Sequence, residues 1–202
     1  MAINFNLDEI KAQLRQYHDS GEYEFEIGQK IAEAKKIIEP YIGKLGVGIV
    51  IDKDETMVSE WRIMSKYDFG WSDDAIEEGQ NATDLPAFEE VREFMQWCWN
   101  NGISVYILTS TRERHRETVV NLLDNAGYKN YYSGLILRPN DDTGTIQEFK
   151  IRMRKSLVDN GLQIALNIGD QMSDLVGGYS NAVIKLPNPF YLISSIMVEK
   201  HG

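Results

Sequence analysis

Short apolar runs alternate along the chain with segments whose apolar residues recur every three or four positions. Runs this short and this apolar are typical of strands buried on both faces of a parallel sheet. The periodic segments between them predict helices at about 87–98, 119–126 and 146–157. Helices between buried strands indicate an α/β fold in which helices cover both faces of a parallel sheet. The apolar runs are 47–51 (VGIVI), 104–108 (SVYIL), 134–137 (GLIL), 162–168 (LQIALNI) and 182–186 (AVIKL).

Two further helices are predicted before the first strand. Apolar residues recur with helical spacing from Leu7 to Tyr17, after Asn6, which is a suitable N-cap residue. Ser20 and Gly21 interrupt this pattern, and a second stripe runs from Ile27 to Tyr41. We therefore divide the chain into an N-terminal helical segment, residues 1–45, and a main domain, residues 46–202.

Residues 57–86 do not fit the alternation. The segment is polar but contains four aromatic residues, and it follows the first strand directly, which suggests a short cap insertion over the end of that strand. Trp61 and Trp71 are candidates for a wall of a substrate site, and the alternative is that the aromatic residues form a small core of the insertion. The four are Trp61, Tyr67, Phe69 and Trp71.

The charge balance narrows the choice of partners. The chain has 21 basic and 31 acidic side chains and a net charge of −10, which disfavours binding to a nucleic-acid polymer. Local basic runs at 112–116 and 150–155 are interpreted as solvated helix faces. A transmembrane helix is not expected, because no apolar stretch is long enough. The only cysteine, Cys98, is expected to be buried, and the spacing of the three histidines does not suggest a zinc site.

Polar residues with complementary chemistry follow several of the predicted strands. The carboxyl ends of parallel strands meet at one edge of a sheet, so these side chains should lie close together. Asp52 and Asp54 point the same way from an extended chain, and such a pair needs a cation, a shared proton or both. Carboxylates, hydroxyls and one ammonium suit Mg²⁺ and a phosphoryl group. The set comprises Asp52, Asp54, Thr109, Ser110, Lys150, Asp170 and Asp174.

Four segments, taken in chain order, resemble the four motifs of the haloacid dehalogenase (HAD) superfamily. Asp52, Asp54 and Thr56 match its Asp-x-Asp-x-Thr pattern, the strand ending at Thr109 matches its second motif, and Lys150 matches its third. Asp170 and Asp174 match the fourth motif. Several segments resemble the acid phosphatase branch, which includes plant vegetative acid phosphatases and bacterial nonspecific acid phosphatases, and the likeness covers about residues 45–193. These segments are IGDQMSDLVGG (168–178), KLPNPFY (185–191), FGW (69–71) and AGY (126–128).

The resemblance implies a HAD-type, Rossmann-like core and a Mg²⁺-dependent phosphomonoesterase acting on small substrates. It implies that Asp52 is the nucleophile and forms an aspartyl-phosphate, and that Asp54 is the general acid and base. It places Mg²⁺ on Asp52, on the main-chain carbonyl of Asp54 and on Asp170, with Asp174 supporting the metal or sharing a water. It assigns the phosphoryl oxygens to Thr109, the backbone N–H of Ser110, and Lys150.

The sequence departs from the family pattern at several positions, and functions other than a phosphatase are also considered. Lys53 stands where the family usually has an apolar residue, so it either forms a salt bridge or alters the field at the nucleophile. Thr111 stands where the branch often has arginine, and residues 57–59 replace a leucine-rich turn. A non-catalytic storage or binding relative and a phosphotransferase to a small alcohol are the alternatives. A signalling receiver domain is disfavoured, because it has no second aspartate two residues after the phosphoacceptor.

The location of the protein is also open. The resemblance favours a periplasmic or secreted mature form, whereas the first residues lack the features of a signal peptide and favour the cytoplasm. The sequence does not indicate an oligomeric state.

Overall fold

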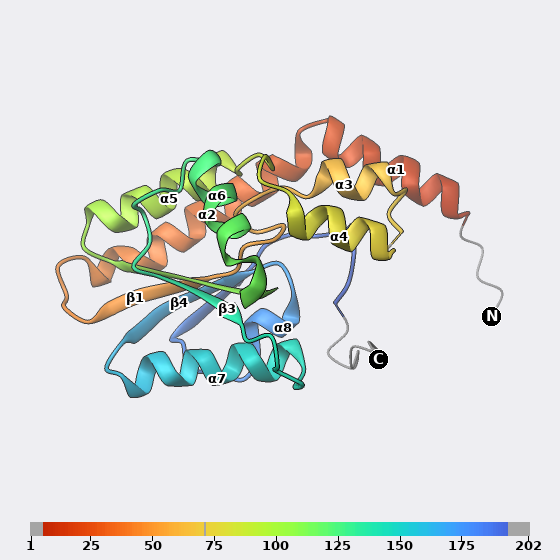
Figure 1. Cartoon of the computed structure of the whole chain (residues 1–202). Helices are drawn as coiled ribbons and strands as arrows, with labels where there is room; N and C mark the ends of the chain where they lie inside the picture. Colours follow the sequence, from red (N-terminus) through yellow and green to blue (C-terminus); the bar gives the residue numbers. More distant parts are fainter. Residues whose placement is uncertain (1–5, 71, 194–202) are drawn as a thin grey trace, which may run out of the picture.

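The computed structural model describes residues 6–70 and 72–193, which form an α/β fold around one parallel sheet (Figure 1). Five strands lie in the order β3-β2-β1-β4-β5, and every neighbouring pair is parallel. The predicted fold class is therefore confirmed. The strands are β1 (Val47–Ile51), β2 (Ser104–Arg112), β3 (Gly134–Arg138), β4 (Gln163–Gly169) and β5 (Ala182–Lys185).

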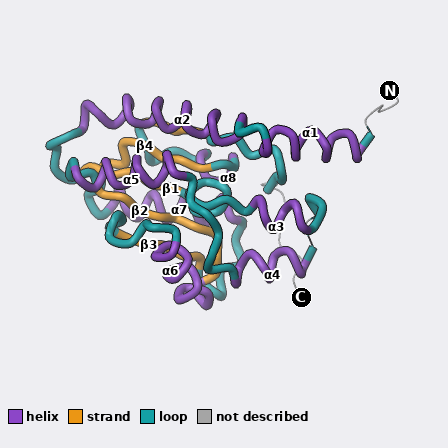
Figure 2. The backbone as a smooth tube through the Cα atoms, turned by 90° about the horizontal axis from the view of Figure 1, so that it is seen from above, coloured by secondary structure: helices purple, strands orange, loops and turns teal. Residues whose placement is uncertain are grey.

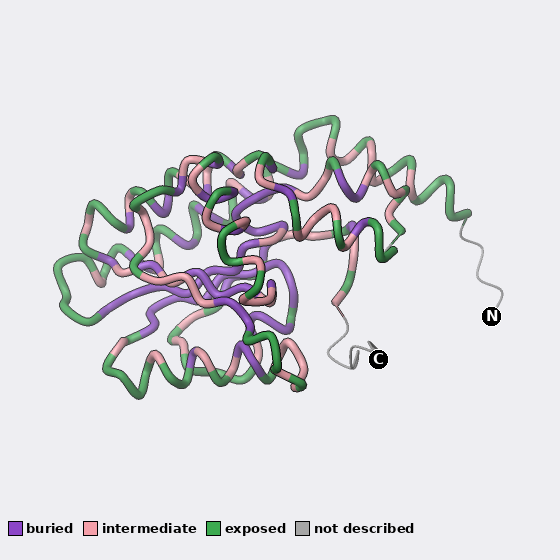
Figure 3. Tube along the Cα trace, viewed as in Figure 1, coloured by how far each residue is buried: buried purple, intermediate pink, exposed green. Residues whose placement is uncertain are grey.

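Helices cover both faces of this sheet. On one face lie α2 (Glu22–Ile38), α5 (Glu89–Asn100) and α6 (Arg116–Asn125), and on the other lie α7 (Ile146–Asp159) and the short α8 (Met172–Leu175) (Figure 1). The central strands β1 and β4 are buried along most of their length, whereas the edge strands β3 and β5 are only partly buried (Figure 3). The first face carries the larger apolar core, to which Cys98 contributes a buried thiol. The α7 face carries a smaller core of Val50, Leu108, Phe149 and Ile164.

The N-terminal helices differ from each other in burial. α1 (Leu7–Asp19) begins at Asn6, whose side chain accepts hydrogen bonds from the backbone of Asp8 and Glu9, as the sequence predicted. α1 buries none of its residues, whereas the apolar stripe of α2 belongs to the main core. Seen from above, α1 continues beyond the sheet and lies beside α3 (Trp61–Lys66) (Figure 2). The division at residue 45 stays a prediction about folding units.

Residues 57–86 contain two helices that the sequence pattern did not predict, α3 and α4 (Asp73–Asn81). Isolated bridges join Val58 to Asp54 and to Ala87, so the segment leaves and re-enters the core at one place. Both helices are short, and therefore lack the long apolar stripe that marks α2 or α5.

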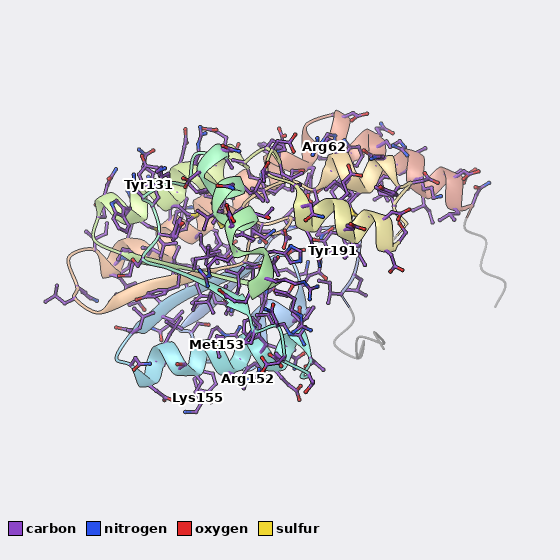
Figure 4. All side chains as sticks on the ribbon, viewed as in Figure 1. Arg62, Tyr131, Arg152, Met153, Lys155 and Tyr191 are labelled. Atoms are coloured by element: carbon purple, nitrogen blue, oxygen red, sulfur yellow. The ribbon has the colours of Figure 1, made fainter. Side chains whose placement is uncertain are left out.

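Two further predictions from the sequence need correction. β2 continues to Arg112, four residues past the predicted end, because its ladder with β3 extends to the pair Arg112 and Arg138. The basic run at the start of α7 is not wholly a solvated face, because Lys150 and Arg154 are 2% and 0% exposed. Arg152 and Lys155 of the same helix are exposed (Figure 4). No helix in the described ranges is long and apolar enough to cross a membrane.

Candidate active site

The central position of β1 places Asp52 between two other strand ends. Ile51, the last residue of β1, pairs with Ile107 of β2 on one side and with Ile168 of β4 on the other. The Asp52 N–H extends the ladder by donating to the Ile168 carbonyl at 3.0 Å. Asp170 follows β4 directly, so the first and fourth motifs meet at the carboxyl edge of the sheet, as predicted.

Lys150 joins these carboxylates from the second turn of α7. Its Nζ donates to Asp52 Oδ1 at 2.7 Å and to Asp174 Oδ1 at 2.5 Å, and all three side chains are buried. Thr145 begins α7 with a capping box that includes Glu148, which fixes where the helix starts and therefore where Lys150 lies. The sequence assigned Lys150 to phosphoryl oxygens, and in this structure it holds two aspartates.

Neutral donors orient Asp170 and also contact Asp174. Asp170 Oδ1 accepts from the Thr56 hydroxyl at 3.1 Å, and its Oδ2 accepts from the side-chain amides of Gln171 (2.6 Å) and Asn188 (2.7 Å). Asp174 Oδ2 accepts from the backbone N–H of Gln171 at 2.9 Å. The DxDxT threonine and the KLPNPFY asparagine thus both serve the fourth motif.

The cluster has more negative than positive charge, and this affects its protonation. Oxygens of Asp52, Asp170 and Asp174 all lie within 4.8 Å of one another. Burial raises the pKa of Asp52 well above its usual value; Lys150 opposes the rise, and Asp174 and Asp170 add to it. Burial and Asp174 raise the pKa of Asp170 to about 6. Burial lowers the pKa of Lys150, but the charges of Asp174 and Asp52 outweigh it and keep the group cationic.

This donor set fits a hard divalent cation. Three buried carboxylates face one ammonium, and oxygen donors of this kind are those that Mg²⁺ prefers. Burial and the repulsion between the carboxylates raise the pKa values of Asp52 and Asp170, and a cation would offset the repulsion.

Asp54 lies at the more exposed side of the cluster. Its side chain is 23% exposed, and its Oδ1 accepts a hydrogen bond from Lys53 Nζ. Lys53 is itself buried, and although burial lowers its pKa, the neighbouring Asp54 raises it by more, so the ammonium stays charged. The unusual lysine of the first motif is thus a salt-bridge partner of the second aspartate.

Thr109 and Ser110 lie within β2, next to β1, rather than after the strand. The Thr109 hydroxyl donates to Thr111 Oγ1 and accepts from the Thr111 N–H, both at 3.1 Å. The structure therefore brings Thr109 to the same sheet edge, with its hydroxyl on Thr111 rather than on Asp52 or Lys150. The contacts of Thr109 and Ser110 to a phosphoryl group stay a prediction.

The two predicted wall residues have different outcomes. Trp61 stacks on His18 of α1, with ring centroids 3.8 Å apart and planes 9° apart, and it also packs against Phe69 and Phe190. It therefore belongs to an aromatic cluster that joins α1, the insertion and the KLPNPFY segment. Trp71 lies outside the described residues.

Glu55 is a buried carboxyl that the sequence reasoning passed over. It is 0% exposed and accepts from the Tyr23 hydroxyl and from the Glu60 N–H, both at 2.7 Å. Burial raises its pKa to about 8, despite these two hydrogen bonds. Its place inside the DxDxT motif was the one available signal, and its partner on α2 could not be inferred from a single sequence.

A model of the HAD superfamily, subfamily IIIB (acid phosphatase), matches residues 2–194. The chain belongs to HAD subfamily IIIB. The predicted family is confirmed, and so is the prediction of a phosphoric monoester hydrolase, at the level of this family.

Curated relatives of this subfamily IIIB chain include both phosphatases and storage proteins. It is 32% identical to acid phosphatase 1 of Solanum lycopersicum over 193 residues, which cover 92% of this chain and 75% of that protein. It is also 32% identical to vegetative storage protein 1 of Arabidopsis thaliana over 153 residues, 72% of this chain and 55% of that protein. The class C acid phosphatase of Bacillus anthracis has the same fold, with a TM-score of 0.73 at 18% identity, covering 91% of this chain and 86% of that one.

Proposed function

We propose that this chain is a Mg²⁺-dependent phosphatase that hydrolyses small phosphate monoesters through an aspartyl-phosphate on Asp52. The observation that carries this proposal is the meeting of Asp52, Asp170 and Asp174 around the Lys150 ammonium in a buried position. Four ionisable groups so close together are not needed to stabilise a fold, because burying them costs free energy. Sites of this kind are more often functional.

In this proposal the carboxylate of Asp52 attacks phosphorus, and Asp54 gives a proton to the leaving oxygen. Asp54 then takes a proton from the water that releases phosphate. Lys53, in contact with Asp54, fixes the orientation of that carboxyl. Lys150 favours the ionised form of Asp52 and orients its carboxylate, and the hydroxyl of Thr109 and the N–H of Ser110 donate to phosphoryl oxygens.

The metal would be held by Asp52, the Asp54 carbonyl and Asp170, with Asp174 beside them. When bound, Mg²⁺ supplies positive charge that offsets the negative charge of the phosphoryl group and the carboxylates.

A storage role is the second candidate, supported by the likeness to vegetative storage proteins. The presence of both Asp52 and Asp54 favours the enzyme over this alternative. Transfer of the phosphoryl group to a small alcohol would use the same residues as hydrolysis.

The test is phosphate release from 4-nitrophenyl phosphate by the purified chain after dialysis against EDTA. We expect no turnover in EDTA and recovery when Mg²⁺ is added, with Asp52→Asn inactive in both conditions. Full activity without metal would overturn the metal assignment, and inactivity of the wild-type chain in Mg²⁺ would favour the storage role. Adding a small alcohol separates transfer from hydrolysis, because transfer releases more 4-nitrophenol than inorganic phosphate.

A further inference from the structure

Arg154 lies one helical turn after Lys150 on α7 and is completely buried. Its guanidinium donates to the main-chain carbonyls of Asp174, Val176 and Gly178, the last at 3.1 Å from Nε. In the described part of the chain no carboxylate is recorded within hydrogen-bonding distance of this guanidinium. Its donors are therefore directed at one segment of backbone, the loop that follows the fourth motif.

This loop has a backbone that needs support. Gly177, Gly178 and Tyr179 have φ values of 89°, 78° and 68°, in the left-handed region that L residues such as Tyr179 rarely adopt. A Cβ at Gly177 would collide with the side chain of Ile151, so the loop packs closely against α7. The three carbonyls that Arg154 binds are those of alternate residues through this same turn.

Two residues of α7 bind Asp174, one at its side chain and one at its main chain. Lys150 Nζ contacts its carboxylate, and Arg154, four residues later, contacts its carbonyl. The side chain of Asn167, in β4, donates to the same carbonyl at 2.8 Å. The Asp174 backbone therefore has little freedom to move relative to Lys150 and Asp170.

We propose that Arg154 is a positioning residue for the metal site, which it serves by fixing the loop that carries Asp174 beside Asp170. The inference rests on the proposed function, because it takes the cluster of Asp52, Asp170 and Asp174 as the Mg²⁺ site. A guanidinium presents five donors in a planar fork and reaches three carbonyls at once, whereas the lysine ammonium is a compact point charge. Arg154→Lys keeps the charge and loses that geometry.

The experiment measures Mg²⁺ binding to Arg154→Lys without substrate, by calorimetry and by Mg²⁺-dependent thermal shift. Outer partners of metal ligands typically change metal affinity by about 10–100-fold, so we expect at least about tenfold weaker binding. At saturating Mg²⁺ the substrate KM should equal that of the wild type, and kcat should recover. Arg152→Lys is the matched control, since Arg152 is exposed on the same helix and pairs with Asp142, and it should bind Mg²⁺ as the wild type does.

The outcomes separate this inference from the proposed function. A wild-type chain that binds no Mg²⁺ would overturn the metal site and the inference together. A wild-type chain that binds Mg²⁺, with the same constant in Arg154→Lys, would overturn the inference alone, even if the variant unfolds at a lower temperature. If Arg154→Lys does not fold, Asn167→Ser removes the other donor to the Asp174 carbonyl and should weaken Mg²⁺ binding in the same direction. An unchanged constant in that variant would equally overturn the inference.

Discussion

Replacing Glu55 by glutamine should remove the contribution of this carboxyl to the pH dependence of stability above pH 4.5. In the folded chain this carboxyl is buried between Tyr23 and Glu60, and burial raises its pKa from 4.5 to about 8. Between these two values the folded state holds a proton that the unfolded state releases. The stability that this proton provides is therefore complete below pH 4.5 and is lost as the pH rises through 8.

The size of the effect follows from the two pKa values. One unit of pKa shift corresponds to about 1.36 kcal/mol, so the interval from 4.5 to about 8 corresponds to about 4–5 kcal/mol. Glutamine cannot ionise, so the variant lacks this slope. It also loses an acceptor for one of two donors, the Tyr23 hydroxyl or the Glu60 N–H, at a pH-independent cost of about 1–3 kcal/mol. The slope of the unfolding free energy against pH therefore tests the prediction. The absolute unfolding free energy does not, because the lost hydrogen bond changes it at every pH.

The assay is urea unfolding of wild type and Glu55→Gln in EDTA at several pH values from 4.5 to 8. EDTA keeps metal binding out of the comparison, and the difference between the two proteins cancels the other titrating groups. Glu33→Gln, at an exposed residue paired with Lys30, should run parallel to the wild type. Parallel curves for wild type and Glu55→Gln would refute the reasoning, as would a wild type that gains stability relative to the variant when the pH rises.

Four other substitutions test the site. Asp52→Asn should lower kcat by more than the ~10²–10⁴-fold that acid–base help is worth, and substantial remaining turnover would reject it as nucleophile. Asp54→Asn should slow glycerol 2-phosphate more than 4-nitrophenyl phosphate, whose leaving group needs little protonation; equal losses would indicate a structural role. Lys150→Met should cost about 3–5 kcal/mol of unfolding free energy in EDTA, because it leaves Asp52 and Asp174 buried without their cation, whereas the exposed Lys155→Met should cost under about 0.5 kcal/mol. Trp61→Ala should raise KM for aromatic monoesters and not for aliphatic ones, and loss of folded protein would instead assign this residue to the core.

The strands and the main cluster could be predicted from the sequence because both depend on local patterns. Apolar runs mark buried strands, and Asp52 and Asp170 follow such runs directly. The last four residues of β2 were missed, because Thr109 and the polar residues after it interrupt the apolar pattern while the hydrogen-bonded ladder continues.

The charged residues that support the cluster could not be predicted, because their burial depends on distant partners. Arg154 looks like part of a solvated basic run, and only its carbonyl partners, 20 to 24 residues further along, make it a buried group. Glu55 is satisfied by Tyr23, 32 residues earlier. A pattern within one segment gives no information about such pairs.

The central place of β1 has a consequence for the synthesis of the chain. One neighbour of β1, β2, begins at Ser104, whereas the other neighbour, β4, begins only at Gln163. Lys150, which contacts Asp52, is 98 residues from it in the sequence. Until β4 emerges from the ribosome, the VGIVI strand has one unpaired edge, and such edges invite pairing between chains. Pairings so distant in sequence also form slowly. A chain truncated before residue 163 should therefore aggregate rather than retain partial activity.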